Sequence, residues 1–200
     1  MEALLAEKKR KKSPVKVPDY LIYEVVGGKP IYYKGYKDVL NKTKTFEEIR
    51  MDSTLQAWLK FRVGFLLGGF LLENGYEITS GEQGFILPNR DKRGADLAIF
   101  PAEGFVINEH YSRQTPEVTI EIDVKADTEN STEMDYVLEK IADYHRFGVK
   151  KVIWIFTKNR KVMVAPANEP WPTLDWTADI EVVKGLTLNL GTLASNQQQA

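Results

Sequence analysis

The order of predicted elements in the second half of the chain restricts the fold more than any other feature. Residues 117–125 alternate apolar and polar side chains, as a strand does, and residues 151–157 form an apolar run that predicts a buried strand. Between them, residues 132–147 have helical periodicity, with a capping box that begins at Thr132 and a stop at Gly148. Strand, helix and strand in this order predict a right-handed crossover between parallel strands, so the helix must cover one face of a sheet.

The first half of the chain predicts a second long helix and several short strands. The helix covers residues 53–74, and Phe61 and Phe65 widen its apolar stripe, so we expect it to be buried on more than one side. An N-terminal β-hairpin turns at Gly27-Gly28. Further strands are expected at residues 76–79, 84–87, 95–100 and 161–165. Together these elements predict an α/β (α+β) fold with helices packed on a mixed sheet.

Composition limits the class of protein. The 200 residues fit one domain, which we place at residues 19–193, between a flexible basic arm (1–18) and a frayed polar tail (194–200). The chain has no cysteine, which excludes a disulfide scaffold and a thiolate zinc site and fits the cytoplasm. The most apolar run, residues 63–72, is about half the ~20 residues of a membrane span, so we expect no membrane.

Two acidic residues stand out in the predicted strands. Asp96 lies inside the apolar strand at residues 95–100, where a carboxylate is costly unless it is paired or binds a metal. In the later strand, Glu121 and Asp123 share the polar face. A solvent-exposed strand face would by itself explain Glu121 and Asp123, but it would not explain an acid such as Asp96 inside an apolar strand. Carboxylates from adjacent strands suit a hard cation, so we expect Asp96 and Glu121 to face one another and hold Mg²⁺ or Mn²⁺, with Asp123 as a further ligand.

Basic residues precede the strand that carries Asp96. We expect Arg90, Lys92 and Arg93 to contact the phosphates of a nucleic acid. The net charge of −1 argues against a strongly basic protein that coats DNA, but it leaves room for an enzyme that touches DNA through one local patch.

The spacing of these residues resembles that of a known family. The pattern consists of Asp96, Pro116-x4-Glu121, Lys140-x3-Tyr144, Gly148-Val149 and Trp154. It is similar to the Uma-two-type putative restriction endonuclease family of the PD-(D/E)XK nuclease superfamily, over roughly residues 40–190. The resemblance implies a restriction-endonuclease-like mixed sheet flanked by helices, with metal-dependent hydrolysis of DNA phosphodiester bonds. It further implies that Asp96 and Glu121 are the two acids of the site and that Lys140 is its basic residue.

The choice of lysine is open, because the sequence departs from the family pattern nearby. The departures are Ala95 for proline, Asp123 and Lys125 for apolar or small residues, and Thr157 for aspartate. Read literally, residues 123–125 form a D-x-K triplet, which makes Lys125 the alternative catalytic lysine. We favour Lys140, because Lys125 lies about four residues, or ~13 Å, past Glu121 on an extended strand. Lys140 is expected on the flank of an apolar helix stripe formed by Val137, Leu138, Ile141 and His145.

Two functions compete, beside a third interpretation as a structural interaction module with no nucleic-acid role, which rests on the near-neutral charge. The first is a magnesium-dependent endonuclease that cuts DNA. The second is a catalytically silent relative that binds DNA or a partner protein, in one version as a homodimer. The presence of both acids and a candidate lysine favours the enzyme.

Overall fold

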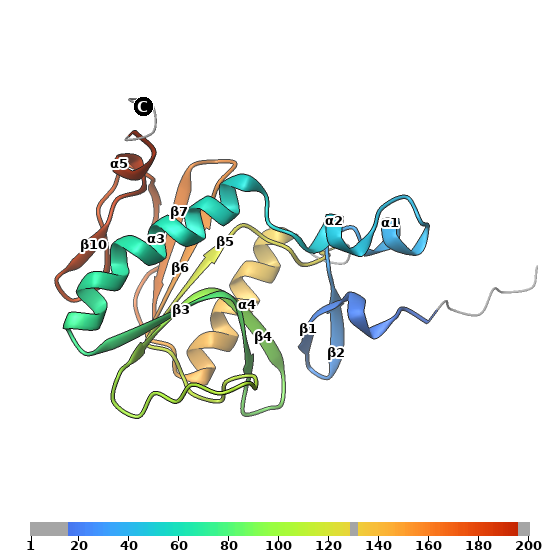
Figure 1. Ribbon diagram of the computed structural model, residues 1–200, viewed down its shortest axis with the longest axis horizontal. Coiled ribbons are helices and arrows are strands. Elements are labelled where there is room, and N and C mark those ends of the chain that lie inside the picture. Colours follow the sequence, from blue (N-terminus) through green and yellow to red (C-terminus); the bar gives the residue numbers. More distant parts are fainter. Residues whose placement is uncertain (1–15, 129–131, 196–200) are drawn as a thin grey trace, which may run out of the picture.

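An eight-stranded mixed sheet forms the centre of the computed structural model, which describes residues 16–128 and 132–195 (Figure 1). The sheet order is β2-β1-β4-β5-β6-β7-β8, and β3 pairs with β4. The sheet strands are β1 (Ile22–Val26), β2 (Lys29–Tyr32), β3 (Tyr76–Ile86), β4 (Lys92–Pro101), β5 (Val118–Ile122), β6 (Lys151–Phe156), β7 (Lys161–Pro166) and β8 (Thr173–Asp175). A separate two-stranded sheet contains β9 (Ile180–Val183) and β10 (Leu186–Leu188). The helices are η1 (Asp19–Leu21), α1 (Tyr36–Leu40), α2 (Phe46–Arg50), α3 (Thr54–Glu73), α4 (Glu133–Phe147) and α5 (Leu190–Ser195).

The predicted crossover is present. Strands β5 and β6 are parallel neighbours, and α4 connects them. The helix begins where Thr132 and Asp135 form a reciprocal capping box, and it ends at Gly148, whose φ of +105° suits a residue without a Cβ. The other pairings of the sheet are antiparallel, so the sheet is mixed as predicted.

Strand β4 is the junction of the sheet. It pairs with β3 along most of its length, and its other edge meets β5 through residues 97–99 and β1 through Lys92. The two strands predicted at residues 76–79 and 84–87 are one strand, β3, interrupted by a bulge between Ser80 and Gln83. A bulge can re-aim a side chain at an edge, and this one contains Glu82.

Strand β5 is shorter than predicted. It ends at Ile122, because Asp123 has a φ of +59° and turns the chain out of the extended conformation. The side chains of β5 alternate between the two faces of the sheet up to Ile122, with Val118 and Ile120 in the core on the α3 side. Beyond it alternation fails, and Val124 packs on the α4 side instead.

The sheet separates two cores. The core under α3 includes Ile120, Ile153 and residues of the β9–β10 sheet, and the core under α4 includes Tyr144 and Trp154. Figure 1 shows α3 crossing one face of the sheet and α4 lying behind the other. The hairpin β1–β2 and the short helices α1 and α2 lie at the end away from β9 and β10.

Helix α3 is buried on one side only, which corrects the sequence prediction. Ser53 caps its start, and its inward stripe of Leu59, Val63, Leu67 and Leu71 is almost fully buried. Phe61 and Phe65 point outward and are each 67% exposed. By length and composition α3 could cross a membrane, but its inward stripe belongs to the core of the sheet domain.

The predicted arm and tail are mostly not described. Residues 1–15 of the basic arm and residues 196–200 of the tail lie outside the described residues. Helix α5 reaches Ser195, two residues into the predicted tail.

Candidate active site

Asp96 and Glu121 lie on neighbouring strands, as predicted. Strands β4 and β5 pair at Leu97 and Ile120, and Asp96 and Glu121 each lie one residue beyond that pair. Both side chains are buried. The backbone N–H of Ile122 donates to Asp96 Oδ2 at 2.8 Å, which holds the Asp96 carboxylate against the end of β5. The two carboxylates nevertheless contact different helices, Asp96 through Lys60 of α3 and Glu121 through residues of α4.

Glu121 is held by two side chains of α4. Its Oε2 lies 3.1 Å from the Lys140 ammonium, and its Oε1 accepts a hydrogen bond of 2.8 Å from the Tyr144 hydroxyl. Burial raises the pKa of Glu121 to about 7, while Lys140 and the Tyr144 hydrogen bond lower it and Asp96 adds to the rise. The pattern Lys140-x3-Tyr144 therefore places two donors, one turn apart, on the same carboxylate.

Lys140 is more deeply buried than predicted. Its side chain is 1% exposed, and its ammonium also lies 3.0 Å from Glu24 Oε1. Four aromatic rings surround the ammonium at 5.6–5.8 Å, from Tyr23, Tyr136, Tyr144 and Trp154. Lys140 thus belongs to the packed face of α4, whereas Leu138, which we had assigned to that face, is 41% exposed.

Glu24 is a site residue that the sequence analysis missed. Burial would raise its pKa, but Lys140 and Arg93 together hold that pKa below its ordinary value. Its carboxylate also accepts hydrogen bonds from the Tyr136 hydroxyl and the Gly94 N–H. The available signal was the one used for Asp96, an acid inside a strand of apolar residues and β-formers.

Arg93 does not fit its predicted role as a phosphate contact. Its side chain is fully buried, pairs with Glu24 at 2.7 Å, and donates from Nε to Asp143 at 2.8 Å. An arginine enclosed by two carboxylates cannot reach a ligand in solvent. Arg90 and Lys92 are exposed, so for these two residues phosphate contact stays a prediction.

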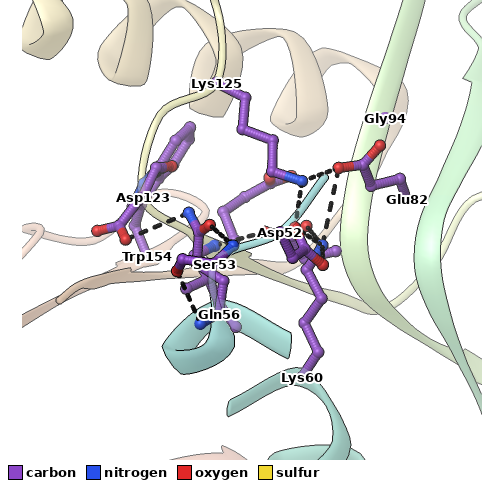
Figure 2. A network of polar contacts seen from close by, with 12 residues as sticks. Asp52, Ser53, Gln56, Lys60, Glu82, Gly94, Asp123, Lys125 and Trp154 are labelled. Carbon is purple, nitrogen blue, oxygen red and sulfur yellow. Dashed lines mark hydrogen bonds and ion pairs between the residues drawn. The ribbon is translucent and has the colours of Figure 1, made fainter. Parts of the chain in front are cut away.

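A second cluster, which we call the Asp52 cluster, surrounds Asp96 on the α3 side. It consists of Asp52, Lys60, Glu82, Asp96 and Lys125. The Lys60 ammonium lies 2.7 Å from Asp96 Oδ1, 2.8 Å from Asp52 Oδ2 and 3.7 Å from Glu82 Oε1. Burial works against its charge, but the carboxylates raise the pKa of Lys60 well above its ordinary value. Figure 2 shows the ammonium groups of Lys60 and Lys125 approaching Asp52 and Glu82 from opposite directions.

Lys125 and Asp123 are each held away from Glu121. Lys125 is ion-paired with Asp52 and Glu82. Asp123 accepts hydrogen bonds from the backbone and hydroxyl of Thr157, at 2.8 and 2.6 Å. Two departures from the family pattern, Asp123 and Thr157, are therefore in contact with each other. Neither residue shares a strand face with Glu121, because β5 has already ended.

The residues as arranged do not fit a divalent cation shared by the two acids. Both oxygens of Asp96 already accept from protein donors, and so do both oxygens of Glu121. Within residues 16–128 and 132–195, no group of three His, Asp or Glu side chains is placed to hold a metal ion. Lys60 was not considered in the sequence analysis, although it falls on the buried stripe of α3.

Two hollows open beside the Asp52 cluster. One has a volume of about 270 Å³ and is lined by Tyr33, Arg50, Asp52, Lys60 and Glu82, among others. A smaller one of about 70 Å³ shares Tyr33 and Glu82 and includes the exposed Lys92. A ligand in these hollows would therefore meet the cluster before it met the enclosed Lys140.

Comparison with known proteins identifies a family and a shared fold. The family described as "Uma2: Putative restriction endonuclease" matches residues 45–191. None of the curated proteins matches the chain. The crystal structure of a putative nuclease belonging to DUF820 from Anabaena variabilis ATCC 29413 covers 86% of this chain and 89% of its own, with a TM-score of 0.63 and 15% identity. An identity this low supports the shared fold alone. The family match, by contrast, spans most of the described domain, and the chain belongs to the Uma2 family of putative restriction endonucleases.

Proposed function

We propose that this protein is an endonuclease that hydrolyses DNA phosphodiester bonds at Asp96, Glu121 and Lys140. The observation that carries the proposal is the buried contact between Lys140 and Glu121, directly beside Asp96 across the β4–β5 pair. An ammonium fixed on a carboxylate by a rigid helix is a preorganised arrangement of the kind that catalysis needs. The family membership supports nuclease-like function in general.

The chemistry that these residues can supply follows from their positions. Phosphodiester hydrolysis requires a water molecule to be activated and the extra negative charge on the phosphate to be stabilised. Glu121, with a pKa raised to about 7, can accept a proton near neutral pH, and the positive charge of Lys140 can stabilise negative charge that develops next to it. The cofactor in this proposal is Mg²⁺ or Mn²⁺, because carboxylate oxygens are the ligands such ions prefer. As arranged, the two acids do not hold such an ion, so Asp96 would first have to separate from Lys60.

Cleavage of supercoiled plasmid DNA tests the proposal. We expect nicking or linearisation with Mg²⁺ or Mn²⁺ and none with EDTA. Asp96→Asn, Glu121→Gln and Lys140→Ala should each abolish cleavage, whereas Lys125→Ala, which changes a lysine outside the Glu121 contacts, should retain most of it. Because Lys140 is buried, each variant is first checked by circular dichroism for a folded domain. Activity that survives Lys140→Ala but is lost with Lys125→Ala would move the site to residues 123–125.

A second function is favoured by one specific observation. Lys60 neutralises Asp96 through an ion pair. Such a pair would hinder catalysis at Asp96 but would not hinder DNA binding, so it is compatible with a catalytically silent relative. Binding of DNA at low salt, together with no cleavage under any divalent metal, would select this function over the enzyme.

A further inference from the structure

We infer that Lys60 occupies the cation position at Asp96, so that a divalent metal ion binds there only in exchange for the Lys60 ammonium. The inference rests on the proposed function for the role of Asp96, and it goes beyond that function by making Lys60 a residue that regulates access to the site.

The first argument is geometric. Three carboxylates from three separate segments converge on the one ammonium of Lys60: Asp96 from β4, Asp52 from the residue before the α3 cap, and Glu82 from the β3 bulge. Carboxylate oxygens are the ligands of a hard cation, but with Lys60 in place these three are not arranged to hold a metal ion, and the ammonium takes the cation position instead. The Lys60 side chain is 8% exposed, and it lines the hollow of about 270 Å³.

The second argument is charge balance. The Asp52 cluster contains three carboxylates and two lysines, which leaves one negative charge without a partner inside the cluster. If a divalent ion replaced Lys60 while Lys125 stayed on Asp52 and Glu82, the cluster would become neutral. The exchange therefore does not bury a net positive charge, which would be costly in this partly enclosed place.

The third argument concerns where the displaced ammonium goes. Lys60 lines the hollow of about 270 Å³, so a change in its side-chain torsions can carry the ammonium toward solvent. Lysine has a flexible stem and a strongly hydrated head group, so water can solvate the ammonium once a divalent ion has taken its place among the carboxylates. Lys140 has no such route, because it is enclosed by aromatic rings.

Binding of Mn²⁺ without DNA tests the exchange, by titration calorimetry or by the paramagnetic resonance signal of the free ion. We expect Lys60→Met to bind Mn²⁺ about tenfold tighter than the wild type or better, because the competing ammonium is gone. Adding Asp96→Asn to Lys60→Met should remove the gain. Lys125→Met is the matched control, since it removes the same charge from the same cluster without uncovering Asp96, and it should gain much less.

The outcomes separate this inference from the proposed function. Equal Mn²⁺ affinity of the wild type and Lys60→Met, or an equal gain with Lys125→Met, would overturn the inference whether or not the wild type cleaves DNA. A gain specific to Lys60→Met without any DNA cleavage would support the exchange and defeat the proposed enzyme. If Lys60→Met does not fold, Lys60→Gln, which keeps a donor for Asp96 but no charge, is compared by the shift of its melting temperature with Mn²⁺.

An independent observation carries a second proposal, that the outward face of α3 pairs with a second copy of this chain. Phe61, Phe65 and Leu72 are 67%, 67% and 59% exposed, and the two phenylalanine rings stack at 6.1 Å. With Gly68 they form a stripe spaced four, three and four residues apart, which is the seam of a coiled coil. Arg62 is the one charged residue from Phe61 to Leu72.

The stripe is complementary to itself. In a two-fold antiparallel pair centred between Phe65 and Gly68, Phe65 faces Gly68 of the second copy and Phe61 faces Leu72 of the second copy. A Cβ added at Gly68 or Gly69 would meet nothing within 4 Å, so both glycines are open to receive a ring. With Leu55 on the flank of the stripe, the exposed apolar area amounts to roughly 450 Å² per copy, or about 900 Å² for the pair, which is close to the least that a specific interface needs.

Light scattering after size exclusion tests the pairing. We expect the wild type to be a dimer at micromolar concentration and Phe65→Glu to be a monomer with an unchanged circular dichroism spectrum. Ile107→Glu, at a more exposed apolar residue far from α3 in the sequence, is the control and should stay dimeric. A wild-type monomer at all concentrations would overturn the proposal, and sedimentation of that monomer with phospholipid vesicles would assign the face to a membrane instead.

Discussion

Replacing Lys140 by alanine should destabilise the fold far more than replacing a surface lysine of the same domain. Lys140 is 1% exposed and is paired with Glu24 and Glu121, which are equally enclosed. The variant leaves two buried carboxylates without their shared cation, and breaking a buried pair in this way costs about 3–5 kcal/mol. For a domain of this length, that corresponds to a drop in melting temperature of roughly 6–20 °C.

Lys150→Ala is the matched control for this prediction. Lys150 forms a single ion pair with Glu117 at 2.9 Å, but its side chain is 72% exposed, so its loss should cost about 1 kcal/mol or less. Urea unfolding of both variants at pH 7 measures the difference. The deficit of Lys140→Ala should shrink at lower pH, because a buried carboxyl without its lysine takes up a proton more readily. Equal stability of the two variants would refute the structural importance of the Lys140 contacts.

Three further predictions concern Glu24, the N-terminal arm and the end of α4. Because Lys140 and Arg93 lower the pKa of Glu24 below 4.5, the stability from this carboxylate is complete above about pH 4.5 and is lost as the pH falls through its folded-state pKa. Urea titrations from pH 6 to 3 should therefore show a smaller loss for Glu24→Gln than for the wild type. Deleting residues 1–13 should weaken DNA binding and flatten its salt dependence, and an unchanged slope would remove the arm from the DNA contacts. Gly148→Ala should cost about 1 kcal/mol or more, because φ is +105° and the new Cβ would lie 3.3 Å from Thr115 Cγ2; unchanged urea unfolding would contradict this.

The parts of the fold that the sequence predicted well depend on local signals. The capping box at Thr132 and the stop at Gly148 each involve residues within one turn of helix, so spacing alone reveals them. The alternation of apolar and polar residues in β5 is also a local signal. It identified Glu121 correctly, but it wrongly extended the strand through Asp123. There a non-glycine residue adopts a left-handed conformation that no pattern in the neighbouring residues announces.

The contacts that organise the candidate site were less accessible, because they join distant segments. Glu24 and Lys140 are separated by more than a hundred residues, and only the sheet order, which brings β1 beside β4, places them together. Lys60 illustrates a different difficulty. Its place on the buried stripe of α3 is visible in the sequence, but a lysine there is easily taken as one that extends its ammonium to solvent. The acid that binds it, Asp96, lies two elements later in the chain.

The ion pair of Lys140 with Glu121 and that of Lys60 with Asp96 differ in how easily they can open. Lys140 is enclosed by α4 and aromatic rings, so its contact with Glu121 is fixed and belongs to the permanent framework of the site. Lys60 lies beside a hollow, so its contact with Asp96 can open. Retention of both acids and Lys140 is therefore not enough to make the chain an enzyme, because Asp96 is neutralised for as long as Lys60 stays in place. Whether the chain cuts DNA or only binds it should depend on how easily that one ion pair is exchanged, and removal of Lys60 is the change that separates the two functions most directly.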